Sequence, residues 1–172
     1  TDKVDGNWDD LFAVQDRVAQ VLTEALDLAV KPAERQRPAE APSLDAYELY
    51  ATGRRYLNQM GRDSLMQAIQ HFERAIAADE RYAPAYSGLG SAYSLGFLAT
   101  GSAETLQKAV RSIERAIDLD AELGEPYPFL CYCYARAGQL DRAFEAGKKG
   151  VALQPDMAQA HYFYGSTLIL AT

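Results

Sequence analysis

Apolar side chains recur along this chain at the three- and four-residue spacing of an amphipathic helix. The first such stretch predicts a helix that ends near residue 30. Its apolar stripe comprises Leu11, Val14, Val18, Val21, Leu22, Ala25 and Leu28. From about residue 46 onward the helical spacing returns, and β-branched residues never cluster as they do in strands. The pattern therefore predicts an all-α chain.

A proline-rich stretch separates the two helical regions. Prolines at this density interrupt helices and stiffen linkers. The prolines concerned are Pro32, Pro38 and Pro42. We therefore predict three parts, which are an N-terminal amphipathic helix in residues 1–30, a proline-rich linker in residues 31–45 and a main domain in residues 46–172.

Small and aromatic residues return at a fixed interval within the main domain. Ala109 and Ala143 are 34 residues apart, and so are Ala116 and Gly150. A period of 34 residues that spans two helices is typical of a tetratricopeptide repeat. Residues 46–172 resemble that family. The resemblance implies an α-α solenoid, a right-handed superhelix of about three and a half helix-turn-helix repeats, preceded by the one amphipathic helix.

The repeat pattern divides the main domain into units, each with a first helix (A) and a second helix (B). The units are about residues 46–82, 83–123, 124–157 and a half repeat at 158–172. The first unit carries about three extra residues around Gln59 to Ser64, and the second about seven near Gly96 to Ala103. The second insertion indicates either a flexible turn or an extra turn on one or both flanking helices.

The half repeat contains no helix B. We therefore expect side chains such as Phe163, Tyr164 and Leu170 to lack the helix that would cover them. Natural arrays usually end in a polar cap, and an exposed apolar patch attracts a partner. This end of the chain favours either a continuation beyond Thr172 or a homodimer through the half repeat.

The recurring residue types have a packing explanation. Small side chains let two helices approach closely, at Gly53, Gly90, Cys131 and Gly165 on helices A and at Ala68, Ala109 and Ala143 on helices B. Large aromatic side chains are expected to fill the gap between helices A and B, at Tyr56, Tyr93 and Tyr134. Because no single pair buries its apolar face alone, neighbouring pairs stack into one core.

The resemblance also implies a binding surface, because helices A of the family line a concave groove. Its groove-facing positions correspond here to Tyr47, Tyr50, Arg54, Asn58, Ser87, Ser91, Tyr132, Arg136 and Tyr162. The same register adds Leu57, Pro84, Ser94, Leu95, Glu125, Pro128, Ala135, Gln159, Ser166, Ile169 and Leu170. This aromatic and hydroxyl-rich set with two arginines suits a partner protein or an extended peptide with apolar and acidic side chains. In the alternative interpretation, Tyr50 and Tyr132 only pack on neighbouring helices.

A second resemblance covers the segment before the repeats. The run DDLFAVQDRVAQVLTEALDL, the linker and DAYELYATGRRYLN are similar to a segment of multidomain bacterial signalling proteins. There it follows a class III nucleotide cyclase domain or a winged-helix DNA-binding domain. Three hypotheses stay open, namely a non-catalytic interaction scaffold, the C-terminal regulatory region of a cyclase or transcriptional regulator, and a self-associating structural piece.

Several partners and compartments are disfavoured. The family subclass that grips chaperone tails uses paired Lys, Asn and Arg. The matching positions here are Tyr50, Arg54, Ser87, Pro128 and Tyr132, which depart from that set at most places, so we do not expect that partner. The net charge of −7 argues against a nucleic-acid surface, which needs a basic stripe. No run is apolar and long enough to span a bilayer and no leader is visible, so we expect a cytoplasmic protein with no membrane partner. Because the chain starts at Thr1 rather than Met, we keep open that it is a fragment.

Motifs that would indicate chemistry are weak. Gly88, Gly90 and Gly96 lack the strand and spacing of a phosphate-binding loop. Cys131 and Cys133 lack a second pair for zinc, and side chains two apart on a helix point about 200° apart, which disfavours a mutual disulfide. The reduced thiols indicate a reducing compartment. We therefore predict no catalytic residue, no metal site and no cofactor.

Overall fold

The computed structural model describes residues 43–59 and 61–170 of the 172-residue chain. The predicted N-terminal helix lies outside the described residues. The described part contains seven α-helices and no strand. The helices are α2 (Leu44–Leu57), α3 (Arg62–Ala78), α4 (Ala83–Thr100), α5 (Ala103–Leu119), α6 (Pro126–Arg136), α7 (Leu140–Leu153) and α8 (Ala158–Leu170).

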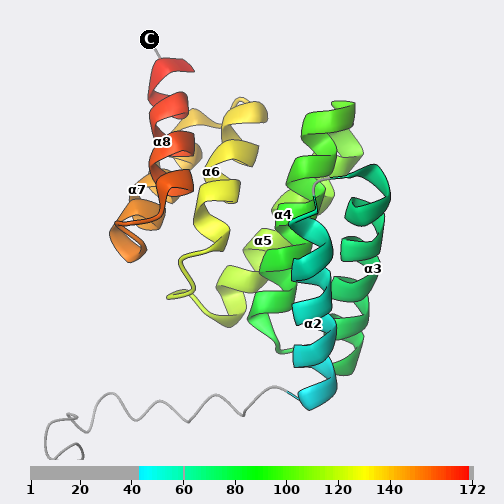
Figure 1. The fold of residues 1–172 in the computed structure, drawn as a ribbon. Coiled ribbons are helices and arrows are strands. Elements are labelled where there is room, and N and C mark those ends of the chain that lie inside the picture. The colour runs from blue at the N-terminus through cyan, green and yellow to red at the C-terminus, as the bar shows by residue number, and fades with distance from the viewer. Residues whose placement is uncertain (1–42, 60, 171–172) are drawn as a thin grey trace, which may run out of the picture. The chain divides into compact units, whose positions relative to one another are not determined.

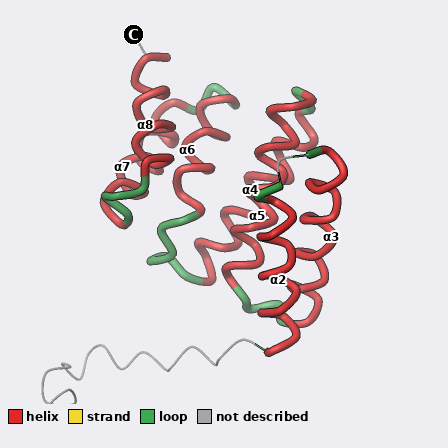
Figure 2. The backbone as a smooth tube through the Cα atoms, in the orientation of Figure 1, coloured by secondary structure: helices red, strands yellow, loops and turns green. Residues whose placement is uncertain are grey.

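The helices pack in chain order (Figure 1). Helices α2 and α3, α4 and α5, and α6 and α7 form three pairs, each joined by a short turn (Figure 2). The first helices of successive pairs also contact one another, from α2 to α4, from α4 to α6 and from α6 to α8. The sequential pairing that the 34-residue period predicts is therefore confirmed, and α2, α4, α6 and α8 form one side of the array.

Small residues mark the closest helix contacts. A Cβ atom added to Gly53 would lie 2.7 Å from Cε1 of Phe72, and one added to Gly90 would lie 2.4 Å from Cγ1 of Ile113. On helices B the matching alanines are fully buried, at Ala68, Ala109 and Ala143. A larger residue at these positions would separate the helices, which explains why small residues recur there.

Tyrosines of helices A connect neighbouring repeats. Tyr93 packs against both core clusters, and its hydroxyl donates a hydrogen bond to Oε1 of Glu73 at 3.1 Å. Tyr134 makes the equivalent hydrogen bond to Glu114, one repeat later. Each bond reaches the helix B of the preceding repeat, so these tyrosines link successive pairs as well as filling the gap within a pair.

The insertion in the second repeat forms helix rather than a flexible turn. Helix α4 continues to Thr100, and α5 begins at Ala103. Gly101 ends α4 in the left-handed region with φ of 66°, and its N–H donates to the carbonyl of Phe97. The hydroxyl of Ser102 accepts a hydrogen bond from the N–H of Thr105 and caps α5. Both flanking helices are therefore longer, as the second of the two alternatives predicts.

Helix α8 closes the described array on the third repeat. The Phe163 ring lies 5.7 Å from that of Phe129 and 5.1 Å from that of Tyr132, measured between centroids. The Tyr164 ring lies against Gly147 of α7. Helices α6 and α7 therefore cover Phe163 and Tyr164 in part, so both residues are half-buried although no helix B covers them in the described chain. Leu170 is exposed, as expected.

The two cysteines lie in the core. Both thiols are free and fully buried, and they contact the hydroxyls of different neighbours. Cys133 Sγ is 3.2 Å from Ser94 Oγ, and Cys131 Sγ is 3.3 Å from Thr167 Oγ1. Burial raises the pKa of Cys133 to about 11. Neither thiol is a reactive nucleophile in this setting.

Candidate functional site

The predicted groove residues on α2 are mostly engaged with their own chain. Tyr50 packs its ring 5.9 Å from Phe72 and 5.5 Å from Tyr82, between centroids, in agreement with the packing interpretation of this residue. Tyr47 and Asn58 are exposed at the two ends of α2. This part of the groove therefore offers exposed side chains at the two ends of α2 and an engaged tyrosine between them.

Arg54 is neutralised by an ion pair across the array. Its Nη1 atom pairs with Oε1 of Glu125, which immediately precedes α6. The two side chains are 36% and 19% exposed, so the pair is partly shielded from water. The guanidinium of Arg54 also donates to the Tyr50 hydroxyl at 3.4 Å. A carboxylate of a partner would have to displace Glu125 in order to bind Arg54.

Two of the predicted groove residues on the first half of α4, Ser87 and Ser91, are buried. Ser87 is 0% exposed and Ser91 is 3% exposed, because α4 packs between α2 and α6. The Ser91 hydroxyl donates to the carbonyl of Ser87 at 2.9 Å. The repeat pattern predicted that these serines face the groove. The structure corrects that prediction, because neither side chain is accessible to a partner.

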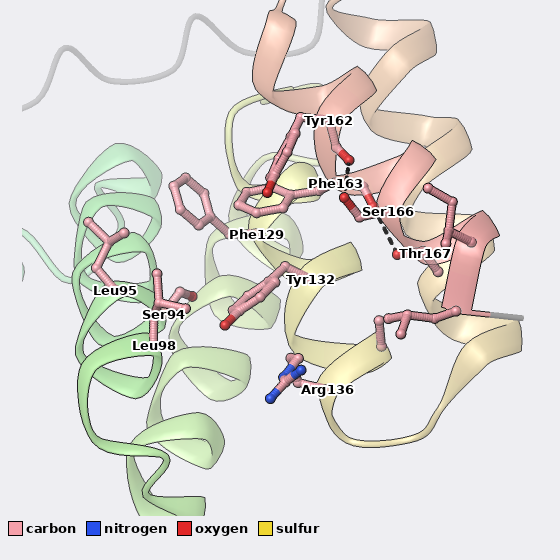
Figure 3. A pocket seen from close by; sticks show the side chains of 13 residues that line it. Ser94, Leu95, Leu98, Phe129, Tyr132, Arg136, Tyr162, Phe163, Ser166 and Thr167 are labelled. Carbon is pink, nitrogen blue, oxygen red and sulfur yellow. Dashed lines mark hydrogen bonds between the residues drawn. The ribbon is translucent and has the colours of Figure 1, made fainter.

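A pocket opens farther along the same side, between α4, α6 and α8 (Figure 3). Its volume is about 480 Å³. It brings together three of the predicted site residues, Tyr132, Arg136 and Tyr162. The other lining residues are Ser94, Leu95, Leu98, Phe129, Ala135, Phe163, Ser166, Thr167, Ile169 and Leu170. The pocket therefore joins the helices A of the second repeat, the third repeat and the half repeat.

Five aromatic rings in mutual contact, which we call the aromatic chain, lie at this pocket, and all of them except Phe97 line it. They are Phe97, Tyr132, Phe163, Phe129 and Tyr162. Their centroids are linked at 6.3 Å from Phe97 to Tyr132, at 5.1 Å from Tyr132 to Phe163 and at 5.5 Å from Phe163 to Tyr162. Rings in tilted or edge contact at these distances pack favourably and present a large apolar surface.

The hydroxyls in the pocket mostly bond to their own helices. Ser94 donates to the carbonyl of Gly90 at 2.8 Å, and Thr167 donates to that of Phe163 at 2.9 Å. Ser166 likewise donates to the carbonyl of Tyr162, as the dashed line in Figure 3 shows. These bonds satisfy the hydroxyl protons and leave the pocket with a largely apolar character.

Three polar groups remain available at the pocket, namely the Arg136 guanidinium and the hydroxyls of Tyr132 and Tyr162. Arg136 is exposed, and its Cζ atom lies 5.9 Å from the centroid of the Phe97 ring. Burial raises the pKa of Tyr132 above its ordinary value of 10.0, and the positive charge of Arg136 offsets part of that rise. Tyr132 is therefore protonated at neutral pH, so its hydroxyl and the Arg136 guanidinium are both hydrogen-bond donors at the pocket.

The groove register missed four lining residues. Phe129 and Phe163 lie five residues after the starts of their units, where the first two units have Ala51 and Gly88. This change from small to aromatic side chains at one register position could have indicated from the sequence that Phe129 and Phe163 line a pocket. Thr167 also lies off the register, and Leu98 belongs to the extended end of α4, outside the repeat pattern.

No protein-family model matches the sequence. A curated protein of Rhizobium meliloti (strain 1021), named "Putative adenylate cyclase 3", is 26% identical over 150 residues. That match covers 84% of this chain and 26% of the relative, so the chain spans about a quarter of the relative's length.

Solved structures share the fold. The first TPR domain of Spaghetti (RPAP3), bound to the HSP90 peptide SRMEEVD, has a TM-score of 0.62 at 18% identity, over 78% of this chain and 100% of that chain. TTC0263, a TPR protein of Thermus thermophilus, has a TM-score of 0.63 at 20% identity, over 73% and 65%. MamA has a TM-score of 0.57 at 25% identity, over 76% and 70%. The fold is therefore that of tetratricopeptide repeat domains, as the 34-residue period predicts.

The described residues hold no group of three or more His, Cys, Asp and Glu side chains placed to bind a metal ion. Within the same residues, no helix has both the length and the apolarity needed to cross a membrane. The arrangement presents an apolar binding pocket with cationic and hydroxyl donors at its side.

Proposed function

We propose that this chain is a non-catalytic interaction module that binds a peptide or a partner protein on the side formed by its helices A. The pocket between α4, α6 and α8 carries this proposal, because it is apolar, walled by four rings of the aromatic chain and located on the groove side. The peptide-bound RPAP3 domain supports it, since that domain shares the fold and covers most of this chain.

The pocket is large enough to provide useful binding energy. Burying one Leu or Phe side chain of a partner contributes roughly 1.5–3 kcal/mol. Pockets of roughly 300–1,000 Å³ are typical of specific ligand sites, and this one has about 480 Å³. One or two bulky side chains of a partner therefore fit the space and supply much of the affinity of a peptide complex.

A matched pair of leucines tests the site. Leu98 lines the pocket and is 70% exposed, whereas Leu44 lies at the start of α2, outside the pocket, and is 71% exposed. Peptides selected from a random library against the full chain are tested for binding by fluorescence anisotropy. We expect Leu98→Glu to weaken binding at least tenfold and Leu44→Glu to leave it unchanged. Equal affinities of the two variants would show that the pocket is not the binding site.

We propose a bacterial signalling or regulatory protein of the cytoplasm as the setting of this module. The similarity to a rhizobial adenylate cyclase supports this setting and, as the alternative, a role as the C-terminal regulatory region of a nucleotide cyclase or transcriptional regulator. The upstream sequence of the gene distinguishes the two. A cyclase domain there, with activity that changes when the pocket is blocked by Leu98→Glu, favours the regulatory alternative.

A second copy of the chain is the other candidate partner. Tyr162 is 68% exposed, and the neighbouring α8 side chains Leu168 and Leu170 are 46% and 59% exposed. Burying these apolar side chains in a homodimer would remove them from water. Sedimentation equilibrium of wild type and Leu170→Glu tests this, since a dimer built on α8 dissociates in the variant and a strict monomer at high concentration excludes it.

A further inference from the structure

Building on the function proposed above, we infer that the partner's recognition element pairs a bulky apolar side chain with a single carboxylate group. The apolar side chain enters the pocket between α4, α6 and α8, and the carboxylate binds the Arg136 guanidinium at its side. The inference concerns the chemistry of the partner and depends on three observations.

The first observation is the contrast between the two arginines of the predicted groove. Arg54 is paired with Glu125 of its own chain. Arg136, by contrast, has its guanidinium over the Phe97 ring, and the described chain places no carboxylate within ion-pair distance of it. A partner's carboxylate meets an unpaired cation at Arg136 and has to compete with an internal carboxylate at Arg54.

The second observation is the contact of Arg136 with the Phe97 ring. The Cζ atom lies 5.9 Å from the ring centroid, within the range of a cation–π contact, and no hydrogen bond within the described residues uses the N–H donors of this guanidinium, which leaves its edge for other partners. Carboxylates bind such an edge through two parallel hydrogen bonds, which are stronger than bonds between neutral groups.

The third observation is the polarity of the pocket. Its serine and threonine hydroxyls donate to carbonyls of their own helices, which leaves Arg136 and the hydroxyls of Tyr132 and Tyr162 as donors toward a ligand. Donors beside an apolar wall select an acceptor, and the positive charge of Arg136 selects an anionic one. Because the chain itself has a net charge of −7, a long acidic run would be repelled, which favours one carboxylate over many.

Paired synthetic peptides test the inference. Each peptide carries one Phe, Leu or Trp and one Glu, at every spacing up to one helical turn, and its twin carries Gln in place of Glu. A third set has the apolar residue near the C-terminus, as free acid or as amide, so that a side-chain carboxylate and a terminal carboxylate are distinguished. Binding to the full chain is measured by fluorescence anisotropy at low and high salt.

We expect wild type to prefer Glu over Gln, or free acid over amide, by about tenfold, and this preference to fall at high salt. Arg136→Gln should abolish the preference, whereas Arg136→Lys should keep part of it, since the charge remains and the two-bond geometry is lost. Arg54→Gln is the matched control and should keep the full preference. Circular dichroism melts confirm that each variant is folded.

The possible failures separate the inference from the proposed function. If the Glu and Gln peptides bind equally and binding still depends on Leu98, the role of the partner's carboxylate is refuted, and the pocket remains the binding site. A preference that survives Arg136→Gln, or one lost in Arg54→Gln, would overturn the role of Arg136. If no peptide of any set binds, the pairing of an apolar side chain with a carboxylate is wrong, and the random-library selection then decides whether the pocket binds peptides at all.

Discussion

Gly90 and Gly165 hold the same register position, each seven residues after the start of its unit. Alanine substitutions at the two positions therefore compare a helix A that is covered by a helix B with one that is not. A Cβ at Gly90 would lie 2.4 Å from Cγ1 of Ile113 and 3.1 Å from its backbone nitrogen. A Cβ at Gly165 would meet nothing within 4 Å. The two substitutions should shift stability in opposite directions.

The magnitudes come from two opposing effects. In a helix, alanine is favoured over glycine by roughly 0.5–1 kcal/mol, and this gain applies at both positions. At Gly90 the added methyl group overpacks the contact with α5, at a cost of about 1–3 kcal/mol. The backbone of α5 must move as well as the Ile113 side chain, which places the cost toward the upper end. We expect Gly90→Ala to destabilise by up to about 2 kcal/mol and Gly165→Ala to stabilise by up to about 1 kcal/mol.

Thermal and urea denaturation, followed by circular dichroism, measure both changes. For a chain of this size 1 kcal/mol corresponds to roughly 2–4 °C in melting temperature. Gly53→Ala is an internal control, since its Cβ would lie 2.7 Å from Phe72, and it should behave like Gly90→Ala. A Gly165→Ala variant destabilised as much as Gly90→Ala would refute the reasoning, because it would show that another helix covers that position.

Three further predictions concern single groups. Burial and the neighbouring Glu73 raise the pKa of Tyr93 to about 12, so stability should be full below its ordinary value of 10.0 and decline as the pH rises to about 12. Thermal melts across this range measure the decline, which Tyr93→Phe should reduce in part, since other buried tyrosines such as Tyr82 also have a raised pKa. The buried Cys133, with its pKa raised to about 11, should react with a chromogenic disulfide reagent only after unfolding in urea; fast labelling of the native chain would contradict this. Glu125→Gln should destabilise by about 1 kcal/mol, as expected for a partly exposed ion pair, and should increase the affinity for acidic peptides by freeing Arg54. An unchanged peptide affinity would argue against that release.

The fold could be predicted from the sequence because each helix of a repeat packs mainly against the helices next to it in the chain. Gly90 and Ile113 meet between the two helices of a single hairpin, and Gly53 meets Phe72 in the same way in the preceding hairpin. The burial of Tyr134 against the preceding repeat follows the same rule. Contacts of this kind depend on residue size at fixed intervals, which a sequence displays directly.

The groove was only partly predictable, because its shape depends on how successive repeats are rotated. Arg54 and Glu125 are separated by 71 positions in the chain, and no local pattern brings them together. The same rotation buries Ser87 between neighbouring helices. Leu98 reaches the pocket through an extension of α4 that no repeat pattern contains, although Gly101 marks where that extension ends.

The ion pair of Arg54 with Glu125 changes the expected folding behaviour of the array. Helical repeat arrays behave nearly as one-dimensional chains in which each unit senses its immediate neighbours, so the ends fray first. Here the first unit is tied directly to the third, past the unit between them. Fraying at α2 therefore removes a support of α6 as well, and native-state hydrogen exchange should report these distant helices opening together instead of one after the other.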